Sequence, residues 1–286
     1  MRKIKQYLSL VVFAHTVFAL PFAFIAFTMA CIAVPPERPL VLLVQVLVCM
    51  VTARNSAMSF NRYADRFIDA QNQRTKGREL PSGALSPQSA ISFFMVNVLT
   101  FLTCCLTISW LCFFLAFPAL VLLCGYSYTK RFTWLCHFVL GCALAVAPAG
   151  AYIAVTGTLS LSVCLLSVIV WLWVSGFDIL YALPDEEHDR THGLHAIPQQ
   201  FGRKAALRSS AALHFLVVPL LLLFGLRLHL SYGYWVAALI FAALLVYQHA
   251  IVKANDISRL NRAFFTANGV ASILFAVLTV IDMAVW

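Results

Sequence analysis

The most constraining feature of this 286-residue chain is a succession of apolar runs, each about as long as a membrane-spanning helix. About 20 consecutive apolar residues cross the hydrocarbon core of a bilayer as a helix. Because the runs are continuous rather than alternating, they exclude a β-barrel. We therefore expect an all-α, polytopic membrane protein in which residues 1–286 form a single transmembrane domain. The nine predicted spans are residues 7–33, 39–59, 89–107, 110–126, 134–156, 160–182, 206–225, 231–251 and 264–286.

Composition supports this class. Hydrophobic residues make up 62% of the chain and charged residues 11%, against about 45–50% and about 25% in soluble domains. The nine cysteines all lie inside the apolar runs and form no CxxC pair, so we interpret them as small hydrophobic residues. Separating the third span from the fourth requires a tight turn near Ser109.

Lysine and arginine are distributed unequally between the two sides of the predicted bundle. Seventeen of the 20 lie at the N-terminus and in the connections near 60–88, 127–133, 183–208 and 252–263, whereas Arg38 and Arg227 lie on the opposite side. Cytoplasmic loops carry such an excess. We therefore expect an inner (cytoplasmic) membrane protein with its N-terminus and large loops in the cytoplasm and its C-terminus outside. Position explains the net charge of +9, so no nucleic-acid partner is expected.

The first polar cluster follows the second span. Asn61, Asp65 and Asp69 are spaced at i, i+4 and i+8, which places all three on one face of a helix. Two carboxylates one turn apart are unfavourable neighbours unless a cation lies between them, and oxygen donors suit Mg²⁺. The basic run at residues 74–78 supplies partners for phosphate oxygens. A solvated interfacial helix is the alternative interpretation.

The second polar cluster lies at the end of the sixth span and just beyond it. Asp185 and Asp189 are again one turn apart, and Asp178 precedes them inside the span. An ionisable group in a membrane span is a functional candidate by default. Two acid clusters on the same membrane face make a purely structural role less favoured than a cation site.

Two other functions fit parts of this pattern. His188 and His192 could share a helical face and suggest zinc, but Gly193 is expected to end that helix and no cysteine joins them. Many spans with intramembrane acids also suit an ion-coupled transporter. Transporters usually show internal repeats and acids near the bilayer midplane, whereas here the acids crowd one interface.

Three motifs occur in order along the chain. They are Asn61-xxx-Asp65-xxx-Asp69 followed by Arg74-Thr-xx-Arg78, then Tyr126-Ser-Tyr-Thr-Lys130-Arg131, then Tyr181-Ala-xx-Asp185-xxx-Asp189. Their order and spacing resemble those of the intramembrane aromatic prenyltransferases of the UbiA superfamily. Arg62 departs from the pattern, because many of the 4-hydroxybenzoate enzymes carry an acid there.

The resemblance implies specific roles for these residues. Asn61, Asp65 and Asp69 would hold one Mg²⁺–diphosphate, and Asp185 and Asp189 a second. Catalytic roles are implied for Asp65, Asp185 and Lys130, with Lys130 and Arg74 or Arg78 neutralising the leaving diphosphate. The residues expected to bind substrate are Asn61, Arg62, Arg74, Arg78, Tyr126, Lys130, Arg131, Asp178 and Tyr181.

The resemblance also implies the architecture and the reaction. The helices would surround a central cavity open to lipid, in which a polyprenyl group passes from its diphosphate to a ring carbon of a small aromatic acid in quinone biosynthesis. The acceptor would be 4-hydroxybenzoate, as for ubiquinone, or a dihydroxynaphthoate in the branch that serves the futalosine route to menaquinone. An apolar cavity would hold the tail and keep water from a carbocation. Tail length depends on cavity depth, which the sequence does not give.

Overall fold

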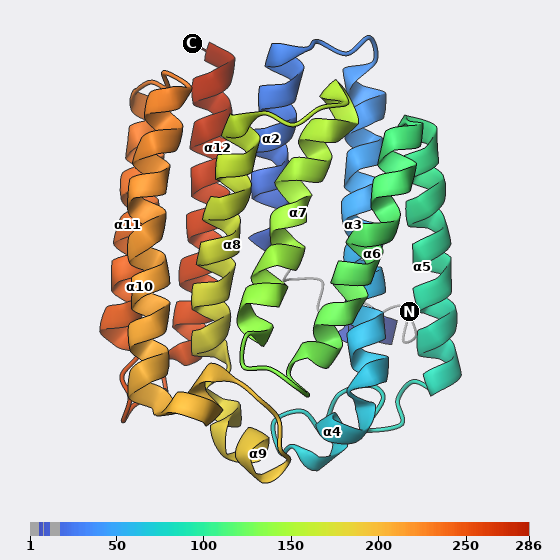
Figure 1. Ribbon diagram of the computed structural model, residues 1–286, viewed down its shortest axis with the longest axis vertical. Helices are drawn as coiled ribbons and strands as arrows, with labels where there is room; N and C mark the ends of the chain where they lie inside the picture. Colours follow the sequence, from blue (N-terminus) through green and yellow to red (C-terminus); the bar gives the residue numbers. More distant parts are fainter. Residues whose placement is uncertain (1–5, 8, 12–17, 286) are drawn as a thin grey trace. The chain divides into compact units, whose positions relative to one another are not determined.

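The computed structural model describes residues 6, 7, 9–11 and 18–285 (Figure 1). The chain divides into two compact units. The first unit comprises Met1–Thr16 and Leu40–Tyr128, and the second comprises Val17–Pro39 and Thr129–Trp286. Regular structure in the described residues is entirely helical, which confirms the predicted all-α class. The single domain predicted for residues 1–286 stays a prediction.

Three long helices and one short helix make up residues 39–129 of the chain, most of the first unit. Residues from three of them form a small apolar core: Phe101 and Cys105 on α5, and Ala116 on α6, with Cys49 of α3 packed against it. The sulfur atoms of Cys49 and Cys105 lie 3.7 Å apart, and all nine cysteines are free thiols. The helices are α3 (Pro39–Ala64), α4 (Arg66–Gln71), α5 (Pro87–Ile108) and α6 (Trp110–Thr129).

The second unit contains the remaining helices. Within it α7 packs against α2 and α8, α8 against α10, and α12 against α11 and α2. Its elements are α2 (Leu20–Ala33), α7 (Cys136–Thr156), α8 (Leu161–Tyr181), the 3₁₀ turn η2 (Leu183–Asp185), α9 (Glu186–Thr191), α10 (Ile197–Arg227), α11 (Tyr232–Ile251), the π-helical turn η3 (Arg262–Ala267) and α12 (Asn268–Val285).

The predicted spans agree with the helices in the described part of the chain. Eight helices there are long and apolar enough to cross a membrane, and they correspond to the second through ninth predicted spans. The first predicted span contains α2, an apolar helix of 14 residues, while residues 12–17 of that span lie outside the described residues. The predicted turn at Ser109 is confirmed, because α5 ends at Ile108, Ser109 has extended backbone angles and α6 begins at Trp110.

Close helix packing in the second unit depends on small residues. A Cβ atom at Gly141 of α7 would lie 2.6 Å from the carbonyl oxygen of Trp171 on α8 and would collide with the Ser175 hydroxyl. By contrast, a Cβ at Gly150 on the same helix meets nothing within 4 Å. Small residues let membrane helices approach closely, so Gly141 sets the spacing between α7 and α8.

A chain of polar side chains crosses the interior of the second unit. The indole nitrogen of Trp173 donates to Asn268 Oδ1 at 3.0 Å, and Asn268 Nδ2 donates to Gln248 Oε1 at 3.3 Å. Gln248 in turn lies 3.3 Å from His214, whose Nδ1 is 2.8 Å from His249 Nε2. In a bilayer these groups have no water to bond, so they satisfy one another and join α8, α10, α11 and α12.

Asp282 near the end of α12 has a structural partner. Its Oδ2 accepts a hydrogen bond of 2.7 Å from the backbone N–H of Ser231, directly before α11, and the side chain is buried. A carboxylate at a helix N-terminus satisfies an orphan N–H and matches the helix dipole. This acid, which lies apart from the two predicted clusters, therefore holds two helix ends together.

Candidate functional site

The first acid cluster lies at the end of α3, in the first unit. Although α3 ends at Ala64 and α4 begins at Arg66, backbone bonds from Asp65 N to Asn61 O (2.9 Å) and from Asp69 N to Asp65 O (2.8 Å) continue the helical pattern. The three side chains therefore follow one helical face, as the spacing predicts. Asn61 Nδ2 donates to Asp65 Oδ2 at 3.1 Å and to Ser127 Oγ at 3.3 Å.

Both carboxylates of this cluster are withdrawn from solvent. Asp65 is 2% exposed and Asp69 is 4% exposed. Arg78 Nη1 lies 2.7 and 2.8 Å from the two carboxylate oxygens of Asp69, and the Thr75 hydroxyl donates to the Asp69 carbonyl at 3.0 Å. The loop that carries the basic run thus folds back onto the acid cluster. A solvated helix with exposed charges does not describe this arrangement.

The other predicted site residues of the first unit differ from one another in burial and in hydrogen-bond partners. Arg62 is buried and its Nε donates to the carbonyl of Leu10 at 3.3 Å, so this guanidinium has a backbone partner within the first unit. Arg74 is exposed, with its backbone N–H bonded to the Asn72 side chain at 2.9 Å. Tyr126 is half-buried near the end of α6.

In the second unit, Asp178 has a partner that sequence reasoning did not identify. Its Oδ2 lies 2.7 Å from Nδ1 of His137, near the start of α7, and His137 is 3% exposed. The backbone N–H of Ile197, the first residue of α10, donates to the other ring nitrogen of His137 at 3.3 Å. One imidazole thus joins three helices at the end of the unit that carries α9.

The second acid cluster lies on the helical path beyond α8. Asp185 ends the 3₁₀ turn, Asp189 lies in α9, and both are half-buried, as is Tyr181 at the end of α8. The carbonyl of Lys130 accepts a bond of 2.6 Å from the backbone N–H of His195. The loop after α6 therefore lies against the loop after α9, and Lys130 and the acid cluster belong to one end of the second unit.

Several charged neighbours form their own pairs. Glu186 accepts from Arg203 at 2.7 Å and from Arg190 at 3.1 Å. Arg131 is exposed.

The rings of His188 and His192 stack at 4.0 Å, and α9 ends before Gly193 as expected. Among the described residues, no three His, Cys, Asp or Glu side chains gather to hold a metal ion by themselves.

Sequence reasoning missed two further residues. One is His137, because nothing in the local sequence indicates that it has a partner 41 positions away. Arg54 lies ten residues before the end of α3, inside a membrane-spanning helix, where its Nη2 contacts the carbonyl of Val11 at 3.4 Å. The sequence does indicate Arg54, because a charged residue within an apolar run is a functional candidate by default.

The acid clusters belong to different units, Asn61, Asp65 and Asp69 to the first, and Asp178, Asp185 and Asp189 to the second. Their expected meeting across a central cavity stays a prediction.

Comparison with known proteins identifies the family. The model of the UbiA prenyltransferase family matches residues 19–270. A 4-hydroxybenzoate octaprenyltransferase of Xanthomonas campestris pv. campestris (strain B100) is 34% identical over 222 residues, which are 78% of this chain and 73% of that protein.

Solved structures show the same fold. A UbiA homologue from Aeropyrum pernix K1, in its apo form, superposes with a TM-score of 0.85 at 28% identity, covering 94% of this chain and 98% of that one. A UbiA homologue from Archaeoglobus fulgidus bound to GPP and Mg²⁺ gives 0.76 at 20% identity, covering 98% and 100%. The family match favours the predicted transferase class over a transporter. This chain is a multi-pass membrane protein that belongs to the UbiA prenyltransferase family.

Proposed function

We propose that the protein transfers a polyprenyl group from its diphosphate to a ring carbon of a small aromatic acid, 4-hydroxybenzoate or a dihydroxynaphthoate, at the cytoplasmic face of the inner membrane. The observation that carries the proposal is the pair of nearly buried acids, Asp65 and Asp69, at the end of a membrane-spanning helix, with Arg78 paired to Asp69. Buried charge at a membrane interface is costly and marks a working site. The name of the Xanthomonas relative supports the choice of acceptor.

The donor set of the first cluster fits Mg²⁺. Asn61 uses its Nδ2 to donate to Asp65 and Ser127, which leaves the carboxamide oxygen as an acceptor. With Asp65 and Asp69 it forms a set of oxygen donors, which hard cations prefer. Asn61, Asp65 and Asp69 would hold one ion, and Asp185 and Asp189 a second. Bound Mg²⁺ would neutralise the charge that develops on the departing diphosphate.

The side chains of this chain supply the rest of the chemistry. The bond from the first prenyl carbon to the diphosphate oxygen breaks and its electron pair leaves with the diphosphate. A ring carbon of the aromatic acid bonds to that prenyl carbon and loses its proton to solvent, to the diphosphate or to a nearby carboxylate. Arg74, Arg78, Lys130 and Arg131 are cations for the diphosphate oxygens. Arg54, inside the membrane-spanning part of α3, is a partner for the carboxylate of the aromatic acid.

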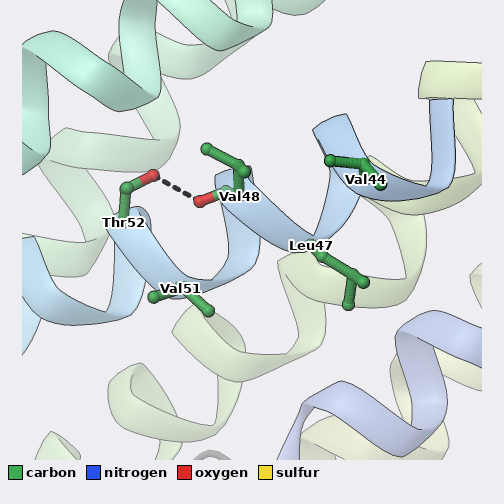
Figure 2. A pocket seen from close by; sticks show the side chains of 5 residues that line it. All are labelled: Val44, Leu47, Val48, Val51 and Thr52. Atoms are coloured by element: carbon green, nitrogen blue, oxygen red, sulfur yellow. Dashed lines mark hydrogen bonds between the residues drawn. The ribbon is translucent and has the colours of Figure 1, made fainter. Parts of the chain in front are cut away.

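One face of α3 offers a binding surface for the isoprenoid chain. Val44, Leu47, Val48, Val51 and Thr52 line a hollow of about 290 Å³ (Figure 2). These positions recur at helical spacing, and the Thr52 hydroxyl is turned to the Val48 carbonyl, 2.7 Å away, so apolar groups line the hollow. Thr52 lies about 20 Å along the helix from Asp65.

A bulky side chain placed in this hollow tests whether it holds the prenyl tail. We expect Val51→Phe to shorten the longest prenyl diphosphate that is used, because the ring would occupy space needed by the end of a long tail. The measurement is turnover with a series of prenyl diphosphates of increasing length. Equal losses for short and long donors would mean that this face does not hold the tail.

The activity itself is tested in purified membranes with radiolabelled polyprenyl diphosphate and a panel of aromatic acids, with and without EDTA. We expect EDTA to abolish transfer, and Asp65→Asn and Asp185→Asn each to lower turnover by at least about 100-fold, typical of losing a group that stabilises leaving-group charge. Near-normal turnover in either variant, with the protein inserted, would remove the two-cluster proposal.

Asp256 provides the matched control acid. It lies in the loop after α11, is exposed, and hydrogen bonds from Ser258 hold its pKa below the ordinary range, so it is ionised at neutral pH. Asp256→Asn removes one negative charge from a cytoplasmic loop without touching either cluster. We expect it to retain wild-type turnover.

A further inference from the structure

A pair of thiols joins α3 and α5 inside the first unit, and the proposed reaction does not use it. The sulfur atoms of Cys49 on α3 and Cys105 on α5 lie 3.7 Å apart. Cys105 is 6% exposed and belongs to the apolar core with Phe101 and Ala116, and the half-buried Cys49 packs against that core. A free cysteine in such a core packs as a small hydrophobic residue, so its reactivity is what distinguishes it from alanine.

Hydrogen bonds on either side of the thiol pair hold the two helices in register. In one direction along α3, Gln45 Nε2 donates to the Thr107 hydroxyl at 3.1 Å. In the other direction, Asn55 Nδ2 donates to Asn97 Oδ1 at 3.0 Å. As the residue number rises on α3 it falls on α5, as it does between antiparallel helices, and the thiol pair lies between the two bonds. Polar side chains in lipid bond across helices, because no water is available to them. The two thiols are therefore kept opposite each other.

The two sulfur atoms are close enough for a covalent bond to form with little movement. A disulfide has an S–S length of about 2.05 Å, so the sulfur atoms of Cys49 and Cys105 must approach by about 1.6 Å. Rotation of the two side chains about their Cα–Cβ bonds moves the sulfur atoms on this scale. Two uncharged thiols become one uncharged disulfide, so no charge is created in an apolar span. The neighbouring Cys104 donates to the carbonyl of Gln45 at 3.3 Å and has a backbone partner there.

The membrane position of the pair selects the reagent that can oxidise it. Cys49 lies ten residues after Pro39, the first residue of α3, which is about 15 Å along a helix that is long and apolar enough to cross a membrane. A charged, water-soluble oxidant such as oxidised glutathione is excluded from hydrocarbon, whereas a quinone dissolves in it. A quinone also accepts two electrons and two protons, which is the number that two thiols release when they form one disulfide.

We propose that Cys49 and Cys105 are an oxidisable pair, which a membrane quinone converts into a disulfide between α3 and α5. The S–S bond forms as each thiol gives up one proton and one electron, and the two carbonyl oxygens of the quinone become the two hydroxyls of a hydroquinone. A thiol reductant reverses the change by thiol–disulfide exchange and restores both thiols. The pair thereby records the oxidation state of quinones in the surrounding membrane. It does so whether or not the protein transfers prenyl groups.

The test counts thiols in the purified full-length protein in detergent, without air. The probe is duroquinone, because its fully methylated ring has no open position to which a thiol can add. After exposure the protein is unfolded and its remaining thiols are labelled with a maleimide. We expect the count to fall from nine to seven, peptide mass spectrometry to find Cys49 linked to Cys105, and dithiothreitol to restore nine. A count that stays at nine, or a linkage between other cysteines, would refute the proposal.

Alanine variants separate this pair from its neighbour. Cys49→Ala and Cys105→Ala should each keep all of their remaining thiols, whereas Cys104→Ala, which removes the adjacent thiol on α5, should still lose two. If one of the first two variants does not fold, the other gives the same readout. Oxidised glutathione at the same concentration should leave wild type at nine thiols. Loss of two thiols in Cys49→Ala would mean that another pair reacts, and equal oxidation by glutathione would mean that the site does not select quinones.

Discussion

Replacing Arg78 by glutamine should destabilise the protein, because it removes the cationic partner of the buried Asp69 carboxylate in the first acid cluster. The substitution removes contacts of 2.7 and 2.8 Å from Asp69, whose side chain is 6% exposed. Removing one partner of a fully buried ion pair costs about 3–5 kcal/mol, and a single bond to a charged group is worth about 1.5–3 kcal/mol. Because the Arg78 side chain is itself 24% exposed, water screens part of the interaction. We expect a loss near the lower range, about 2 kcal/mol.

The assay is thermal unfolding of the purified protein in detergent, with and without millimolar Mg²⁺. Without the cation, Arg78→Gln should melt several degrees below wild type. With Mg²⁺ it should recover more than wild type gains, because an uncompensated carboxylate binds a cation more strongly and binding to the folded state stabilises it. Asp69→Asn should show no such recovery, since the charge that attracts the ion is gone.

Arg190→Gln is the control for losing a guanidinium. Its side chain is 53% exposed and lies 3.1 and 3.2 Å from Glu186 and Glu187. Exposed pairs contribute about 0–1 kcal/mol, so its melting temperature should stay close to wild type. If Arg78→Gln were no less stable than Arg190→Gln, the Asp69 carboxylate would not be a buried charge. If Mg²⁺ stabilised all variants equally, Asp69 would not bind the cation.

The membrane orientation and the close helix packing can be tested separately. A reporter fused after Trp286 should be active only outside the cytoplasm and one inserted near Thr75 only inside, and both reporting one side would mean an even number of spans. Gly141→Ala should destabilise the protein, because the added Cβ would lie 2.6 Å from a backbone carbonyl oxygen of α8, whereas Gly150→Ala meets nothing and should be neutral or slightly stabilising. Equal melting temperatures for the two alanine variants would contradict the packing described between α7 and α8.

The helices could be predicted because span length and helical spacing are local properties. The turn at Ser109 and the common face of Asn61, Asp65 and Asp69 both follow from residues close in sequence. The partner of Asp178 could not be predicted, because His137 is 41 positions away and becomes its neighbour only when α7 packs on α8. The same holds for the interior polar chain, although a lone asparagine such as Asn268 in an apolar run was a usable signal.

The sequence predicted which residues belong to the candidate site, but not which of them contact one another. Spacing indicated that Asp65 and Asp69 needed cations nearby, and the sequence offered several. Only the fold of the loop shows that Arg78 reaches Asp69 while Arg62 turns instead to the Leu10 carbonyl. Loop conformation depends on tertiary contacts such as the Thr75 bond to the Asp69 carbonyl, which no periodicity encodes.

The interior polar chain has a consequence for how the protein is made. Trp173 enters the membrane long before its partner Asn268, which follows it by 95 residues on α12. Until α12 inserts, the indole of Trp173 and the carboxamide of Gln248 lack that partner in lipid, where unsatisfied polar groups cost several kcal/mol. A chain in which α12 has not yet inserted therefore carries these two polar groups without that partner. Insertion of α12 supplies both groups with their partner, so the second unit becomes fully hydrogen-bonded along this chain only when α12 is in place.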